Sequence, residues 1–224
     1  MVRGGGEKTR KIAVALGASF IMLMMVAQPV SASDLTGSIS DPQGDANRWV
    51  NKNRVIPDYL DIKAATLTLD TESDTYTLTM KMYGAIPDKP MLFNGIHTLF
   101  WQWIIDVDGG PYPYSHWIYT YEEYTVCVMW DGKAWSAELM DFSEMQEPGE
   151  YLVREIAEDD FEVLGDEISV TMPSWWIGDV ESCGWAVGDN GFMSPIPVSD
   201  SYAWWFFDMA GFDMATETFT AWPA

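Results

Sequence analysis

Residues 124–140 read Y-T-V-C-V-M-W-D-G-K-A-W-S-A-E-L-M, two runs rich in apolar, aromatic and β-branched residues on either side of Asp131-Gly132. An Asp-Gly pair between such runs is the strongest short-range signal for a β-hairpin, because both residues tolerate the positive φ of a tight turn. We therefore predict two antiparallel strands, Tyr124–Trp130 and Ala134–Met140.

Alternation with a period of two continues on both sides of this hairpin. Ile62–Leu69 and Thr75–Tyr83 flank the turn residues 72–74 and predict a second hairpin. Helical periodicity is weak, and we expect residues 141–160 to form a loop or a short helical excursion. Further strands are expected at residues 97–107, 117–121, 161–164, 168–172 and 203–207. Strands at this spacing without helices between them predict an all-β fold, an antiparallel two-sheet sandwich that is jelly-roll-like.

The first 32 residues have the three parts of a secretory signal peptide. Four basic residues precede an apolar run over residues 12–27, and Gln28-Pro29 is followed by small residues up to Ala32. We expect cleavage between Ala32 and Ser33, which leaves a single domain over residues 33–224 that is secreted or associated with the cell surface. The alternative is an uncleaved membrane anchor, although the apolar run is shorter than the roughly 20 residues that span a bilayer.

The composition is strongly acidic and rich in aromatic residues. The chain has 34 acidic and 12 basic residues and a net charge of −22, with 12 Trp, 10 Tyr and 10 Phe. Such a negative charge repels phosphate backbones and anionic lipids, so we expect no nucleic-acid partner. The aromatic content is too high for a disordered chain and predicts a folded domain.

The two cysteines, Cys127 and Cys183, allow two interpretations. Outside the cytoplasm an isolated pair can form a disulfide bond. Cys127 also lies within an apolar strand, where a buried free thiol is equally compatible with the sequence. The sequence leaves both open.

Four motifs in a fixed order resemble a known class of secreted domains. They are D-P-Q-G-D at residues 41–45, P-D-Y-L-D-I at 57–62, W-I-I-D-V-D-G-G at 103–110 and Y-T-V-C-V-M-W-D-G at 124–132. Over about residues 41–175 this order resembles DOMON-like domains and family 9 carbohydrate-binding modules. The resemblance implies a two-sheet sandwich that binds a ligand, which is a sugar or haem in characterised relatives, and often a structural calcium ion.

Four aspartates around turns near the predicted strand Ile62–Leu69 are candidate calcium ligands: Asp41, Asp45, Asp58 and Asp61. Calcium takes six to eight oxygen ligands, which loop aspartates beside glycine can supply. The alternative is ordinary turn chemistry without an ion. Asp106 and Asp108 begin a D-x-D-G pattern, but the residues after Gly110 lack the rest of an EF-hand loop, so a turn that ends a strand is expected there.

The number of tryptophans exceeds what we expect a core of this size to need. On the strand at residues 97–107, Trp101 and Trp103 share one face, and both faces are mostly apolar, which predicts a central strand covered on both sides. Exposed Trp faces stack on sugar rings or bind another protein. We expect at least two tryptophans in one exposed patch, and the candidate ligand-binding residues are Trp101, Trp103, Trp117, Trp175 and Trp176.

No catalytic arrangement stands out in the sequence. The two histidines, His97 and His116, lie in no metal-binding motif, and no nucleophile motif is present. We therefore expect a non-enzymatic protein. The first hypothesis is a secreted module that binds carbohydrate through an aromatic patch, with calcium as a structural ion. The alternative is a structural or interaction protein of the cell surface, a subunit of an extracellular assembly that can self-associate.

Overall fold

The hairpin around Asp131-Gly132 is present in the structure, a computed structural model. Strands β5 (Tyr124–Trp130) and β6 (Trp135–Asp141) pair antiparallel, with Trp130 opposite Trp135. Gly132 has a φ of 86°, and Asp131 Oδ1 accepts the backbone N–H groups of Lys133 and Ala134, both at 2.8 Å. The aspartate side chain thus stabilises the turn that the glycine makes possible.

The structure describes residues 34–46, 56–92, 96–108, 123–143, 151–178, 180–193, 203–213 and 218–223. The predicted signal peptide, its cleavage site at Ala32 and Ser33, the predicted strand at residues 117–121 and Trp117 lie outside these residues. Ser33–Ala224 forms one compact unit. In the described part of the chain, no helix is long and apolar enough to cross a membrane.

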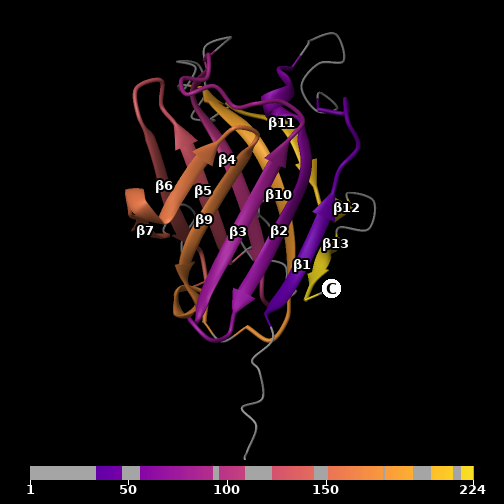
Figure 1. Ribbon diagram of the computed structural model, residues 1–224, viewed down its shortest axis with the longest axis vertical. Coiled ribbons are helices and arrows are strands. Elements are labelled where there is room, and N and C mark those ends of the chain that lie inside the picture. The colour runs from indigo at the N-terminus through magenta and orange to yellow at the C-terminus, as the bar shows by residue number, and fades with distance from the viewer. Residues whose placement is uncertain are drawn as a thin grey trace, which may run out of the picture. The chain divides into compact units, whose positions relative to one another are not determined.

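Two antiparallel sheets pack against each other, as Figure 1 shows, so the predicted all-β two-sheet sandwich is confirmed. The first sheet has the order β1-β2-β3-β9-β8. Its strands are β1 (Leu35–Ser40), β2 (Ile62–Asp70), β3 (Thr75–Met82), β8 (Phe161–Leu164) and β9 (Glu167–Pro173).

The second sheet has the order β12-β13-β10-β4-β5-β6-β7, and β11 also pairs with β10. Besides β5 and β6, its strands are β4 (Ile96–Asp106), β7 (Leu152–Ile156), β10 (Cys183–Met193), β11 (Ala203–Ala210), β12 (Phe212–Asp213) and β13 (Thr218–Trp222). The described helical segments are three short 3-10 turns: η1 (Asp58–Leu60), η2 (Glu158–Asp160) and η3 (Ser174–Trp176).

The sandwich core is built around large aromatic side chains. Trp101, Trp103, Trp185, Trp222 and Tyr76 are among the largest side chains that are fully buried. The indole of Trp103 donates to the carbonyl of Thr79 at 3.3 Å, and that of Trp222 donates to the carbonyl of Leu67 at 2.8 Å. Both bonds connect the second sheet to the first. These indoles therefore fix the distance between the sheets and also fill the space between them.

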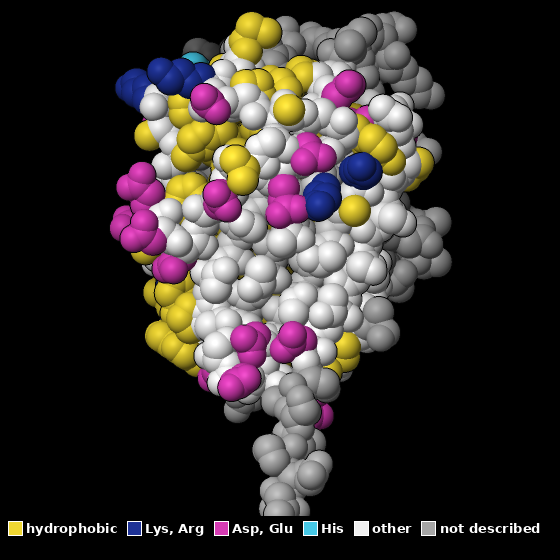
Figure 2. All heavy atoms as spheres, in the orientation of Figure 1, with side chains coloured by type: hydrophobic (Ala, Val, Ile, Leu, Met, Phe, Trp, Pro, Cys, Tyr) yellow, Lys and Arg dark blue, Asp and Glu magenta, His cyan; other side chains and the backbone are white. Residues whose placement is uncertain are grey.

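The outer faces of the two sheets differ. On the first sheet, Ser and Thr residues of neighbouring strands lie side by side, and Thr36 pairs with Thr68 and Thr66 with Thr79 through their hydroxyl groups. Figure 2 shows the middle of this face as mostly uncharged. On the second sheet, the outer side chains Phe100 and Cys127 are buried, so β4 is covered on both sides as predicted.

Five strands were not predicted as strands: β1, β7, β10, β12 and β13. The segment of β10 contains several glycines, which lower the expectation of a strand. In the fold these glycines permit close contacts, because a Cβ on Gly184 would lie 2.8 Å from the Cβ of Phe219. Similarly, β1 contains Gly37, whose Cβ would lie 2.5 Å from the Trp222 ring. Glycine is required at both positions by packing, which the sequence alone does not reveal.

The two cysteines are free and buried, so the disulfide interpretation is wrong. Cys127 lies opposite Gln102, which lies opposite Gly188, five residues along β10 from Cys183. Five residues of strand span about 16 Å. Disulfide geometry requires α-carbons within about 7 Å, so these two side chains cannot be joined.

Candidate metal centre

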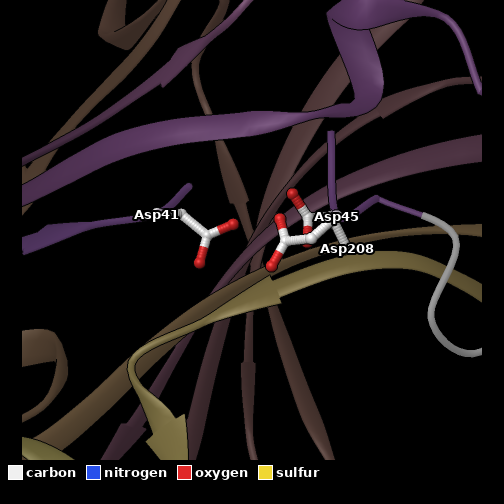
Figure 3. Close-up of side chains that lie close together, drawn as sticks. All are labelled: Asp41, Asp45 and Asp208. Carbon is white, nitrogen blue, oxygen red and sulfur yellow. The ribbon is translucent and has the colours of Figure 1, made fainter. Parts of the chain in front are cut away.

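Five aspartates gather between the two sheets, and we call them the inner cluster: Asp41, Asp45, Asp61, Asp189 and Asp208. Carboxylate oxygens of Asp41, Asp45 and Asp208 all lie within 4.8 Å of one another, and Figure 3 shows these three side chains gathered at one place. Asp41 and Asp45 belong to the turn after β1, whereas Asp208 belongs to β11. Residues more than 160 positions apart in sequence therefore form one group.

The turn after β1 is held in place by hydrogen bonds to the start of β2 and the end of β3. The backbone N–H of Asp41 donates to the carbonyl of Lys63 at 3.1 Å, and the hydroxyl of Tyr83 donates to the carbonyl of Asp41 at 2.8 Å. Gly44 has a φ of 80° and donates its N–H to Asp61 Oδ2 at 2.8 Å. The left-handed conformation at Gly44 turns the chain so that Asp45 lies close to Asp41.

Asp208 connects the two sheets through its carboxylate. One oxygen accepts the backbone N–H of Ile62, the first residue of β2, at 2.7 Å. The other accepts the N–H of Met209 at 2.9 Å. Each oxygen keeps a lone pair for a further ligand, because a carboxylate has about four acceptor positions.

Asp189 lies at the base of the inner cluster, inside the sandwich. It is opposite Asp208 on one side and opposite Trp101 on the other, and Trp101 faces the core. Its side chain is fully buried, and neither carboxylate oxygen makes a hydrogen bond of good geometry to any residue that the structure describes. A buried carboxylate without partners costs several kcal/mol as an anion, so Asp189 must be neutralised by a proton or a cation.

The pKa values of the inner cluster are all shifted in the same direction. Burial, followed by the charges of neighbouring aspartates, raises the pKa of Asp41 to about 8. Burial also raises the pKa of Asp208 to about 7, the pKa of Asp61 above its ordinary value and the pKa of Asp189 well above it. The opposing contributions come from backbone N–H groups, and no described basic side chain contributes to these shifts.

The donor set determines which cation fits. All five side chains offer oxygen, and none offers nitrogen or sulfur. Calcium binds six to eight oxygens with flexible geometry, whereas magnesium keeps several waters and rarely uses a cage made only of protein. The residues present therefore fit calcium.

The structure brings together part of the predicted calcium set. Asp41 and Asp45 are in the group, and Asp61 contacts it through Gly44. Asp58 is not in it, since its side chain is exposed at the start of η1 and its backbone carbonyl accepts the N–H of Gly84 at 2.9 Å. This corrects the prediction for Asp58, whose contribution is to a turn.

The sequence interpretation missed Asp189 and Asp208. Both lie far from residues 41–61 along the chain, and only the pairing of β10 with β11 brings them together. A signal was present, because each aspartate follows apolar residues in a segment that forms a strand. A charged residue within such a segment requires a partner.

The predicted aromatic patch is largely wrong. Trp101 and Trp103 are fully buried in the core, because the β4 face that carries them packs between the sheets, so they cannot stack on a ligand. Trp175 is 64% exposed, and its ring centre lies 6.2 Å from that of the half-buried Trp176 at an interplanar angle of 84°. Among the tryptophans whose side-chain burial the structure describes, Trp175 is the exposed one.

Comparison with known proteins adds no relative. No protein-family model matches the chain, and neither a curated protein nor a solved structure is significantly similar to it. The resemblance to DOMON-like domains and family 9 carbohydrate-binding modules therefore stays a prediction.

Proposed function

We propose that this chain is an exported, non-catalytic binding domain whose two sheets are held together by a calcium ion in the inner cluster. The observation that carries the proposal is Asp189, a fully buried carboxylate beside four others, whose oxygens make no hydrogen bond of good geometry among the described residues. A divalent cation neutralises this charge and supplies the missing partner. Since Asp208 already contacts β2, an ion bound to it would join the sheets at that point.

Isothermal titration of chelator-treated protein with calcium tests this part. Asp208→Asn removes one carboxylate from the group and should weaken calcium binding at the inner cluster by at least tenfold. Asp159→Asn is the matched control, because Asp159 is an exposed aspartate in η2, outside the cluster. Equal affinities for the wild type and Asp208→Asn would contradict the site.

The binding role is supported by the surroundings of Trp175. The guanidinium of Arg154 lies 5.7 Å from the centre of the Trp175 ring, and Arg154 also forms an ion pair with Asp141 at 3.4 Å. An exposed indole beside hydrogen-bonding groups is the usual arrangement for stacking a sugar ring. We therefore place the carbohydrate-binding function at Trp175, away from the buried tryptophans.

Titration against a broad polysaccharide panel tests the carbohydrate ligand. Binding should disappear in Trp175→Ala and persist in Leu164→Ala, a control that removes an exposed apolar side chain from β8. Absence of binding to the whole panel, or binding that survives in Trp175→Ala, would overturn this assignment.

A second candidate function is a cell-surface interaction protein. In the described residues β7 is the outermost strand of its sheet, and Tyr151, Leu152 and Val153 are between 45% and 59% exposed. An edge strand with apolar side chains can pair with a strand of another chain. Light scattering after size exclusion should then show self-association that Val153→Lys abolishes. A monomer at high concentration would exclude self-association through β7.

A further inference from the structure

A second acidic group lies at the end of β4, and we call it the outer cluster: Asp106, Asp108 and Glu123. Carboxylate oxygens of these three residues lie within 4.8 Å of one another. Asp106 is the last residue of β4, and Glu123 directly precedes β5. The group is therefore placed by the pairing of two neighbouring central strands.

The outer cluster is separate from the inner cluster. Asp106 lies opposite Gly184, five residues along β10 from Asp189, which corresponds to about 16 Å of strand. Ile105 faces the core, so Asp106, its neighbour in the strand, points to the opposite face of the sheet. A single ion cannot contact both clusters.

Glu123 is held rigidly in place. Its backbone N–H donates to the carbonyl of Ile105 at 3.2 Å, and its carbonyl accepts the N–H of Phe142 at 2.7 Å. Its side-chain Oε2 accepts the N–H of Val107 at 2.6 Å. The orientation of the carboxylate is thus fixed from both neighbouring strands.

The other oxygen of Glu123 makes no hydrogen bond of good geometry within the described part of the chain. The residue is only 4% exposed, and Oε1 is buried without a hydrogen bond among the described residues. The carboxylates of Asp106 and Asp108 lie beside it, so three side chains of the same charge gather at this place. Like charges on neighbouring strands destabilise a sheet unless something neutralises them.

We propose that Asp106, Asp108 and Glu123 form a second divalent-cation site, of the calcium class, on the outer face of the second sheet. All three donors are carboxylates, which suit calcium rather than a softer metal. Asp106 and Glu123 are buried, whereas Asp108 is exposed. The ion therefore keeps access to water on one side, exchanges more readily than an ion in the inner cluster, and binds more weakly.

Metal analysis after equilibrium dialysis against calcium tests the proposal, because it counts ions per chain. We expect two ions for the wild type and one for Glu123→Gln. The control is Glu162→Gln, which changes an exposed glutamate of β8 and should keep both ions. Asp108→Asn provides a second variant at an exposed position, where folding is least disturbed, and should bind the outer ion at least tenfold more weakly.

The same measurement distinguishes failure of the outer site from failure of the inner site. Asp208→Asn alone should bind one ion, at the outer cluster. The double variant Asp208→Asn/Glu123→Gln should bind none. If Glu123→Gln and Asp108→Asn both bind as many ions as the wild type, with unchanged affinity, the outer site is excluded whatever happens at the inner cluster. If Asp208→Asn alone has no effect on binding, the inner site fails and the outer site stands.

Discussion

The inner and outer clusters have similar chemistry and different surroundings. Each places three carboxylates within 4.8 Å, and in neither does a described basic side chain contribute to the pKa shifts. The inner cluster lies between the sheets and includes the fully buried Asp189, whereas the outer cluster includes the exposed Asp108 on one face of a sheet. Water can hydrate part of the outer cluster but not Asp189.

From this difference we infer that the burial of a carboxylate affects the stability of the fold more than the number of carboxylates does. Because the inner cluster connects β11 to the start of β2, its charge opposes the packing of the sandwich itself. The outer cluster lies within one sheet, between β4 and β5, where its repulsion acts locally. We therefore expect cation binding at the inner cluster to control global stability, and binding at the outer cluster to have a smaller effect.

The largest expected effect is a dependence of stability on pH without calcium. The folded pKa values of Asp41 and Asp208, about 8 and about 7, exceed the ordinary value of 3.8. The folded state therefore binds more protons than the unfolded state between pH 4 and pH 8, and the free energy of unfolding decreases as pH rises through this window.

Thermal melting in chelator from pH 4 to pH 8 measures this effect. The melting temperature should decrease by on the order of 10 °C, which corresponds to several kcal/mol in a domain of this size. In calcium the decrease should be much smaller, because the ion replaces the protons. If the melting temperatures in calcium and in chelator differed by the same amount at every pH, the two clusters would behave like ordinary exposed carboxylates. That result would contradict the prediction.

A smaller effect is expected at the turn that positions Asp45. Gly44 and Gly165 both have positive φ and no atom near the place of a Cβ, so replacement by Ala costs about 1 kcal/mol at either position from backbone strain alone. Only Gly44 donates its N–H to a carboxylate of the inner cluster. Gly44→Ala should therefore also weaken calcium binding several-fold, whereas Gly165→Ala should not.

Titration of both variants with calcium checks this prediction, and urea unfolding measures the shared cost of strain. An equal calcium affinity in Gly44→Ala and Gly165→Ala would show that the turn does not position a ligand.

The fold could be predicted where side-chain alternation and turn residues agree. The hairpin at Asp131-Gly132 and the strands β2 and β3 have both signals, and their bounds were predicted to within about two residues. Strand β10 could not be predicted, because its glycines are explained only by partners such as Phe219 that pack against them.

The candidate site was half predictable for the same reason. Asp41 and Asp45 lie in one turn beside Gly44, a local pattern that sequence reveals. Asp189 and Asp208 join them through strand pairing across the sheet, which sequence spacing does not encode. The prediction for the tryptophans was wrong for a different reason. Their large number suggested a surface patch, but several of them fill the core and hold the two sheets at a fixed distance.

The most direct test of the central claim is the melting temperature of the wild type and Asp189→Asn at pH 8, each in calcium, in chelator and in sodium chloride of matched ionic strength. An ion bound only by the folded state stabilises it by about 2.7 kcal/mol at a hundredfold excess over Kd, which is about 5–10 °C here. Sodium chloride controls for general screening of the net charge.

We expect the order of the two melting temperatures to reverse between calcium and chelator. Calcium should stabilise the wild type by several degrees more than sodium chloride does. In chelator, Asp189→Asn should melt at or above the wild type, because burial disfavours the ionised form of Asp189 and an amide has no ionised form. In calcium it should melt below the wild type, because it binds the ion more weakly. Equal responses of both proteins to calcium, chelator and salt would contradict the claim that an ion between the sheets holds this sandwich together.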